Sequence, residues 1–180
     1  MKDAKWSSQY PDLVDSEYSW FIPNEYTDNP SQLWLDWLLD AGSLTSRLKH
    51  LSKGCFDVLV LDESWCQADS DQVEQFKLRS EEQVWSRRVV LKGFGEPWIV
   101  AHTSIPASSL EGPLAKVLNL SEQPLGELLF TEPSMVRGAI YICRTKTGWG
   151  RRSQFFLFNR PMIVAEYFLD DFINKVHAGT

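Results

Sequence analysis

Two charged residues fall on the apolar faces of segments whose alternation predicts β-strands. In residues 84–91, alternation places Arg87 on the same side as the bulky Trp85, and we assign this face to the core. In residues 162–169, Glu166 interrupts an otherwise apolar strand. A buried charge is costly unless it is paired or binds an ion of opposite sign. Arg87 and Glu166 are therefore the first candidates for chemistry.

Two interpretations of Arg87 and Glu166 follow from the pattern. They could form a buried salt bridge with a purely structural role. Alternatively, they could lie at opposite ends of a cavity that holds a polar aromatic molecule between a cation and a carboxyl group, whose pKa desolvation could raise. The neighbouring Arg88 must point to the other face of its strand, so only one of the two arginines can reach such a ligand.

Other motifs carry weaker signals. The Gly-Phe-Gly sequence at residues 93–95 lacks the third glycine and the following helix of a dinucleotide loop, and it predicts a hairpin turn. His102 stands alone on its strand and residues 108–109 form no nucleophile elbow, so a Ser-His-Asp triad has no positive support. Arg151 and Arg152 are either an exposed pair at the start of a strand or a second contact for an anion.

The cysteines and histidines predict no metal site. Cys55, Cys66 and Cys143 are widely spaced, form no Cys-x-x-Cys pair and do not cluster with any of the three histidines. We expect them to be buried or idle thiols in a reducing compartment.

Length and composition indicate one globular domain. The chain has 180 residues, of which 43% are hydrophobic and 13% aromatic, and it can bury a core without a disulfide or metal. Its formal net charge of −6 argues against nonspecific nucleic-acid binding, which depends on neutralising phosphates. It contains no apolar run of about 18 residues and no apolar leader at its start, so we expect a cytoplasmic protein without a membrane span, and a monomer.

The N-terminal third contains an arm followed by two helices. Residues 1–30 show no periodicity, and we expect them to form an extended arm that lies against the domain through its aromatic side chains. Residues 31–180 then form the domain proper. Apolar residues at helical spacing predict one helix after Ser31 and a second, short helix that Ser43 caps and Gly54 ends.

The rest of the chain predicts an antiparallel sheet. Six segments have the alternation or composition of strands: residues 56–61, 83–92, 98–105, 139–145, 151–158 and 162–169. Residues 64–80 are polar and irregular, residues 108–129 form a helical interlude broken near two prolines, and the tail could form a short helix. Short turns between strands require antiparallel pairing. The fold class is therefore α+β, with one antiparallel six-stranded sheet and helices packed on it.

Several short runs, in this order and spacing, resemble the chorismate pyruvate-lyase family over about residues 33–170. They are Leu35-Asp36-Trp37-Leu38-Leu39 with Ser43-Leu44-Thr45, Trp85-Ser86-Arg87, Gly95-Glu96-Pro97-Trp98, Pro124-Leu125-Gly126-Glu127-Leu128-Leu129-Phe130, Gly148-Trp149-Gly150-Arg151-Arg152-Ser153 and Glu166-Tyr167-Phe168-Leu169. Members of this family are carbon–oxygen lyases that convert chorismate into 4-hydroxybenzoate and pyruvate, the first step towards ubiquinone- and plastoquinone-type quinones.

The resemblance implies an internal ligand site closed by helical flaps, with no metal or organic cofactor. Arg87 matches the family's arginine for the ring carboxylate, and Glu166 matches the carboxyl group that meets the 4-hydroxyl group. Leu125 matches a residue whose backbone lines the site, and Leu44 matches a flap position that is often Met. The two charges singled out by alternation are thus the two that the resemblance nominates.

The chain also departs from the family pattern. Arg88 replaces a common Glu, His102 stands where Arg is common, and the aromatic arm replaces a short N-terminus. The alternative to a lyase is a noncatalytic module of the same fold that binds small aromatic acids, as in the effector-binding domains of GntR-type regulators. Those regulators carry an N-terminal winged helix, for which residues 1–30 are too short and too acidic.

Overall fold

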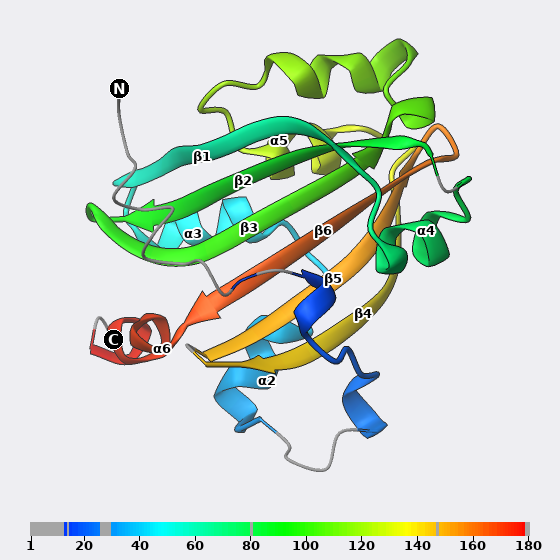
Figure 1. Ribbon diagram of the computed structural model, residues 1–180. Helices are drawn as coiled ribbons and strands as arrows, with labels where there is room; N and C mark the ends of the chain where they lie inside the picture. The colour runs from blue at the N-terminus through cyan, green and yellow to red at the C-terminus, as the bar shows by residue number, and fades with distance from the viewer. Residues whose placement is uncertain (1–12, 14, 26–29, 80, 147, 179–180) are drawn as a thin grey trace.

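A six-stranded antiparallel sheet forms the centre of the molecule. The computed structural model describes residues 13, 15–25, 30–79, 81–146 and 148–178. The strands are β1 (Phe56–Gln67), β2 (Gln83–Gly93), β3 (Glu96–Pro106), β4 (Val136–Thr145), β5 (Gly148–Leu157) and β6 (Arg160–Leu169). Their order across the sheet is β1-β2-β3-β6-β5-β4, and every neighbouring pair is antiparallel (Figure 1). The predicted α+β fold class is confirmed.

Tight turns explain the antiparallel pairing. Phe94 and Gly95, between β2 and β3, both have positive φ angles of 53° and 79°. Phe158 and Asn159, between β5 and β6, have φ angles of 50° and 61°. Two residues with positive φ form the turn whose twist matches that of an antiparallel hairpin.

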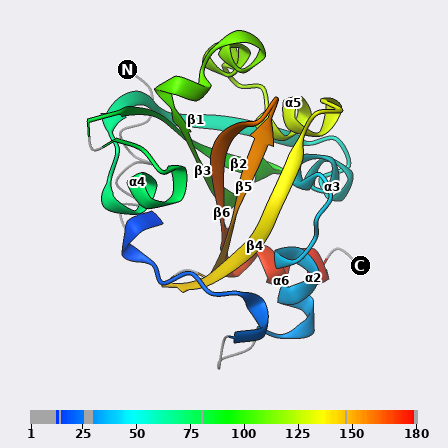
Figure 2. The same ribbon diagram turned by 90° about the vertical axis from the view of Figure 1, so that its right-hand side faces the viewer.

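Helices cover both faces and the ends of the sheet. They are η1 (Asp15–Glu17), η2 (Pro23–Glu25), α2 (Gln32–Leu38), α3 (Leu44–Leu51), α4 (Ser70–Phe76), η3 (Ala107–Ser109), η4 (Gly112–Asn119), α5 (Leu125–Thr131) and α6 (Asp170–Ala178). Figure 2 shows α2, α3 and α6 on one side of the sheet, and α4 and the N-terminal segment on the other. None of the helices in the described part of the chain is long and apolar enough to cross a membrane.

The side of the sheet that carries α2, α3 and α6 holds the largest core cluster. It includes Trp37 and Leu38 of α2, Leu48 of α3 and Phe172 of α6, all packed on strand residues such as Phe168. The side chain of Ser43 accepts a hydrogen bond from the backbone N–H of Ser46, so α3 begins where the sequence predicted.

The prediction that residues 64–80 are irregular was wrong. Strand β1 continues to Gln67, and α4 follows it. Asp69 and Gln72 form a capping box, and Phe76 is buried at the other end of the helix. The spacing of Asp69 and Gln72 was a helix-start signal that the polar composition concealed.

Part of the N-terminal arm lies against the second face of the sheet. The backbones of Phe21 and Ile142 exchange two hydrogen bonds of 2.9 Å, and Tyr18 and Trp20 pack on the ring of Tyr167. Leu13 is buried among strand residues of this face. The predicted contributions of Trp6 and Tyr10 lie outside the described residues, and the division at residue 30 stays a prediction.

Candidate active site

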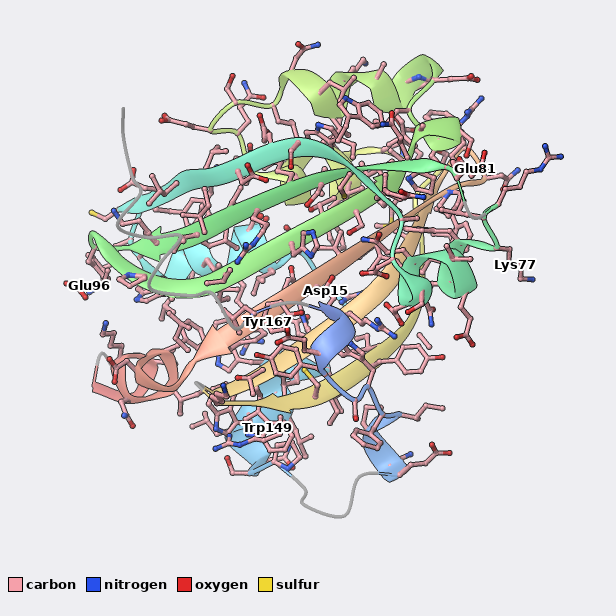
Figure 3. All side chains as sticks on the ribbon, viewed as in Figure 1. Asp15, Lys77, Glu81, Glu96, Trp149 and Tyr167 are labelled. Atoms are coloured by element: carbon pink, nitrogen blue, oxygen red, sulfur yellow. The ribbon has the colours of Figure 1, made fainter. Side chains whose placement is uncertain are left out.

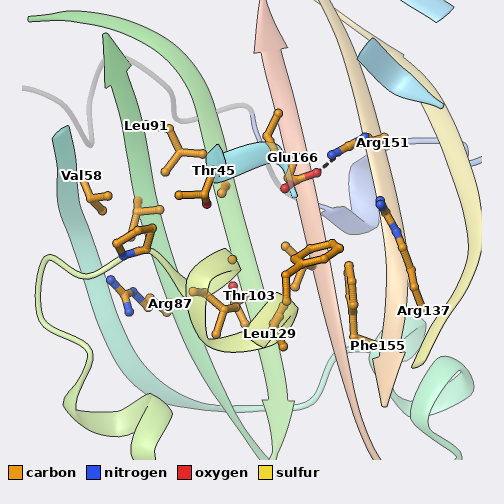
Figure 4. A pocket seen from close by; sticks show the side chains of 18 of the residues that line it. Thr45, Val58, Arg87, Leu91, Thr103, Leu129, Arg137, Arg151, Phe155 and Glu166 are labelled. Atoms are coloured by element: carbon orange, nitrogen blue, oxygen red, sulfur yellow. Dashed lines mark hydrogen bonds and ion pairs between the residues drawn. The ribbon is translucent and has the colours of Figure 1, made fainter. Parts of the chain in front are cut away.

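A largely enclosed cavity lies between the sheet and the helices α3 and α5 (Figure 4). Its walls are mainly apolar side chains from β1, β2, β3, β5 and β6. Its polar lining is a small group: Thr45, Arg87, Thr103, Arg137, Arg151 and Glu166. A mainly apolar enclosure with a few convergent polar groups is typical of a small-molecule site.

Arg87 reaches this cavity from the middle of β2 with hydrogen-bonding capacity to spare. Its side chain is 2% exposed. Nη2 donates to the backbone carbonyls of Ser121 (2.6 Å) and Gln123 (3.2 Å), in the segment before α5. Nε lies 3.3 Å from Oε1 of Glu63, which is the neighbour of Arg87 across the β1–β2 pair, but the two atoms are not in hydrogen-bonding geometry. Nη1 has no hydrogen-bond partner either. Burial lowers the pKa of Arg87, and the charge of Glu63 opposes this. Two buried N–H donors without acceptors can bind a carboxylate.

Glu166 reaches the same cavity from β6 and is held by Arg151 of β5. Its carboxylate accepts a hydrogen bond of 2.6 Å from Nε of Arg151, the residue directly across the strand pair. Nη1 of Arg151 also donates to the carbonyls of Trp37 (2.9 Å) and Asp40 (2.7 Å), at the end of α2. Glu166 is thus fixed in position between the sheet and the chain that leads to α3.

The interpretation of Arg87 and Glu166 as one salt bridge was wrong. Glu166 pairs with Arg151 and Arg87 lies beside Glu63, because these are the residues that the strand register places opposite each other. Figure 4 shows Arg87 and Glu166 at opposite ends of the cavity, as the second interpretation required.

Two helical flaps close the cavity. Leu44 and Thr45 at the start of α3 line it, and so does Leu125 at the start of α5. A Cβ atom on Gly126 would lie 2.4 Å from Oγ1 of Thr45. The two flaps therefore approach each other more closely than a residue with a side chain at position 126 would allow. Lys49 and Glu127 form an ion pair between them. The four site residues predicted from the sequence, Arg87, Glu166, Leu44 and Leu125, therefore lie around one cavity.

Sequence reasoning left Arg151 undecided and missed Arg137, and both arginines line this cavity. Arg151 and Arg152 are not an exposed pair, since they are 1% and 8% exposed in the middle of the sheet. Arg151 lines the cavity, whereas Arg152 on the other face pairs with Asp71. Arg137 also lines the cavity, but the predicted strand began after it. Alternation along the true strand would have assigned these faces.

The opposite face carries a Ser-His-Asp chain that the sequence did not predict. Oγ of Ser86 lies 2.8 Å from Nε2 of His102, whose Nδ1 lies 2.9 Å from Oδ2 of Asp15. Ser86 lies in the middle of β2, which pairs with both β1 and β3 there. The backbone N–H groups of Ser86 and its neighbours belong to the sheet and do not form the oxyanion hole that a serine nucleophile needs. These hydrogen-bonded side chains thus connect the arm to the sheet.

Within the described ranges, no three His, Cys, Asp or Glu residues group as metal ligands.

Comparison with known proteins shows the family to which this chain belongs. The family model described as chorismate lyase matches residues 15–177, which include both helical flaps and all six strands. The chain belongs to the chorismate lyase family. Relatives include "Probable chorismate pyruvate-lyase 2" of Pseudomonas fluorescens (strain Pf0-1), 36% identical over 88% of this chain and 93% of the relative. The chorismate pyruvate-lyase of Enterobacter sp. (strain 638) is 37% identical over 78% and 84% of the two chains.

Solved structures show a likeness of fold to other proteins at low sequence identity. PhnF from Mycobacterium smegmatis matches with a TM-score of 0.56 at 15% identity, over 74% of this chain and 66% of PhnF. The effector domain of PhnF matches with a TM-score of 0.52 at 14% identity, over 72% of this chain and 90% of that domain. At such low identity, the likeness shows that this chorismate lyase family member shares their fold.

Proposed function

We propose that the cavity under α3 and α5 is the active site of a carbon–oxygen lyase that converts chorismate into 4-hydroxybenzoate and pyruvate. One observation carries the proposal: Arg87, with two free buried donors, and Glu166 line opposite ends of the same enclosed cavity. In chorismate, the ring carboxylate and the C4 hydroxyl group are para to each other. A cation and a carboxylate at opposite ends of a cavity are complementary to that pair.

The main contribution that the reaction requires from the protein is to hold the substrate in position. The bond between C3 and the ether oxygen breaks, the ring loses its C4 hydrogen, and the enolpyruvyl group gains a hydrogen to become pyruvate. Formation of an aromatic ring drives the reaction forward. What the site must supply is the reactive conformer of a dianion in an enclosure from which water is excluded.

Each predicted site residue has a role in that task. Arg87 binds the ring carboxylate through its free N–H groups, in a charge-assisted contact. Glu166, held by Arg151, accepts a hydrogen bond from the C4 hydroxyl group and so orients the ring. Leu44 and Leu125 cover the bound ring from the two flaps. The product would supply the ring of a ubiquinone- or plastoquinone-type quinone.

The direct test is turnover of chorismate by the purified protein. We expect 4-hydroxybenzoate and pyruvate to form in equal amounts, with and without EDTA, since we propose that no metal or organic cofactor takes part. Activity lost to EDTA and restored by one divalent ion would overturn the cofactor-free mechanism. Tight binding of 4-hydroxybenzoate without any turnover would instead identify a binding module of the same fold.

We also propose that the protein acts as a cytoplasmic monomer that does not bind nucleic acid. Its net charge of −6 supports the last point, because nonspecific nucleic-acid binding requires an excess of cationic groups. Light scattering coupled to size exclusion should give the mass of a single chain, 20.7 kDa.

A further inference from the structure

Arg137 places a third arginine on the cavity. It lies on β4, the edge strand beside β5, and its guanidinium stacks over the ring of Phe155 at 5.1 Å. Nε donates to Oγ of Ser153 (3.0 Å) and Nη1 to the carbonyl of Asp40 (3.2 Å). Both acceptors are uncharged groups. Across the described ranges, no acidic side chain forms a salt bridge with Arg137.

The charges around the cavity therefore do not balance. Arg151 is paired with Glu166 and Arg87 lies beside Glu63, which leaves Arg137 as the cavity cation without an anionic neighbour in contact. Burial, and then repulsion from Arg151, lower the pKa of Arg137 to about 10, so it remains charged at neutral pH. A partly desolvated cation of this kind is stabilised when an anion binds beside it.

The substrate has a second anion at the matching place. Chorismate carries its enolpyruvyl ether on C3, next to the C4 hydroxyl group, and this side chain ends in a carboxylate. When the ring carboxylate is at Arg87 and the hydroxyl group at Glu166, the second carboxylate must lie near Glu166. Figure 4 shows Arg137 at that end, beside Arg151 and away from Arg87.

We propose that Arg137 binds the carboxylate of the enolpyruvyl side chain and, after the ether bond breaks, that of pyruvate. This assignment rests on the proposed lyase function. It makes Arg137 the residue that distinguishes the substrate, with two carboxylates, from 4-hydroxybenzoate, with one. Arg87 serves both molecules, whereas Arg137 serves only chorismate and pyruvate.

The test compares two ligands in matched variants. In Arg137→Gln, kcat/KM for chorismate should fall by about 30-fold or more, the usual cost of losing a desolvated charge partner. The Kd of 4-hydroxybenzoate should change by less than about 3-fold, a change in binding free energy of about RT. Arg137→Lys should recover part of the loss because it keeps the charge. Arg144→Gln, at an exposed position of the same strand, is the control and should leave both constants unchanged.

The outcomes separate the two proposals. Wild-type protein that forms no 4-hydroxybenzoate would overturn the lyase function and, with it, the role of Arg137. An active wild type with unchanged kcat/KM in Arg137→Gln would overturn the role of Arg137 alone. So would equal losses for chorismate and 4-hydroxybenzoate, which would show that Arg137 only supports the chain around Asp40.

A measurement on the wild type covers the case in which Arg137→Gln does not fold. Pyruvate should inhibit competitively against chorismate, and calorimetry should show pyruvate binding to protein already saturated with 4-hydroxybenzoate. Mutual exclusion of pyruvate and 4-hydroxybenzoate, or the absence of pyruvate inhibition, would contradict a separate carboxylate subsite at Arg137.

Discussion

Two pairs of adjacent arginines divide their charges between the two faces of the sheet. Arg87 and Arg151 line the cavity, whereas Arg152 pairs with Asp71 on the opposite face, where Arg88 lies across from His102. Successive side chains of a strand must point to opposite faces, so each pair of arginines places one charge on each face of the sheet. Because Arg87 and Arg151 each also have an acidic neighbour across a strand pair, these two arginines add donors to the cavity without adding a large excess of charge.

Arg87→Ala should nearly abolish both 4-hydroxybenzoate binding and lyase activity. Losing a desolvated charge partner costs about 2–5 kcal/mol, or roughly 30-fold to several thousand-fold in affinity. Arg87→Lys should restore little, because an ammonium group cannot reproduce the planar fork of donors. Fluorescence titration with 4-hydroxybenzoate and steady-state assays would measure both effects.

Arg88→Ala is the matched control for Arg87→Ala, and it should have a small effect on binding and turnover because Arg88 faces away from the cavity. Circular dichroism and thermal melts must show both variants folded, since Arg87 also holds the carbonyls of Ser121 and Gln123. An inactive Arg88→Ala, or a folded Arg87→Ala that binds the product normally, would contradict the assignment.

At the scale of elements, the site depends on two short helices held against the sheet. The flaps α3 and α5 contact each other through Gly126 and Thr45 and through the exposed Lys49–Glu127 ion pair. An exposed ion pair contributes little to stability, typically 0–1 kcal/mol. This ion pair therefore adds little resistance when the flaps open to admit a substrate and close again over it.

The two flaps should become protected from hydrogen exchange when 4-hydroxybenzoate binds. Backbone amides of residues 44–51 and 125–131 are the ones expected to slow, because ligand binding removes the open states from which they exchange. Exchange followed by mass spectrometry, with and without the product, would locate the change. Protection confined to the face that carries the arm would place the ligand somewhere else.

Gly126→Ala should hold the flaps apart. The added Cβ would lie 2.4 Å from Oγ1 of Thr45, so the side chain of Thr45 or one of the two helices must shift. We expect 4-hydroxybenzoate to dissociate faster and bind more weakly in stopped-flow measurements, and product inhibition to weaken accordingly. If product release limits turnover in the wild type, kcat should rise.

The double variant Gly126→Ala, Thr45→Ser tests the reason for the Gly126→Ala effect. It keeps the hydroxyl group but removes the methyl group, and it should recover only part of the affinity, since Oγ1 makes the closest approach. Unchanged dissociation in Gly126→Ala would show that the contact between the flaps does not control release.

At the scale of the whole molecule, the two faces of the sheet have different tasks. One face holds the cavity, and the other anchors the N-terminal arm through Asp15, which lies near Tyr167 (Figure 3). Asp15 accepts hydrogen bonds from Tyr167 and His102. The anchor lies over the same central strands that carry Arg87 and Glu166 on their other face. No described residue of the arm lines the cavity, so this part of the arm supports the site from behind.

The anchor should make stability depend on pH. Burial alone would lower the pKa of His102, but the charge and hydrogen bond of Asp15 raise it above 6.5, against a smaller opposing effect of Arg88 and with a smaller contribution from Asp69. Burial alone would raise the pKa of Asp15, but His102, Tyr167 and Arg152 together lower it below 3.8. The charge of His102 therefore stabilises the folded state fully below pH 6.5, and this stabilisation is lost as the pH rises through the raised pKa of His102. The charge of Asp15 also stabilises the folded state, and that stabilisation is lost as the pH falls through the lowered pKa of Asp15.

Asp15→Asn should reduce the free energy of unfolding by about 3 kcal/mol at pH 5, where both partners are charged. The difference from wild type should shrink at a higher pH, once the pH has risen through the raised pKa of His102 and the imidazole has lost its proton. Urea denaturation at the two pH values would measure it. Glu17→Gln, an exposed acidic residue of the same helical turn, is the control and should have little effect at either pH. An Asp15→Asn effect that is equal at both pH values would show that charge plays no part in the anchor.

The sequence alone determined the sheet and the two principal charges of the site. Alternation marks the strands because a half-buried strand must place apolar side chains at every second position. The same rule exposes Arg87 and Glu166, since a charge on an apolar face needs a specific partner. Helix caps such as Ser43 are equally local, and the structure shows α3 where that residue predicted it.

Only the tertiary structure decided which groups meet. The register pairs Glu166 with Arg151 instead of Arg87, and this register depends on turns and packing along whole strands. Likewise, no local pattern could show that His102, alone on its strand, meets Asp15 of the arm 87 positions away, or that Arg137 faces the cavity. Alternation assigns a side chain to a face, whereas its partner is set by which distant segments the fold brings to that face.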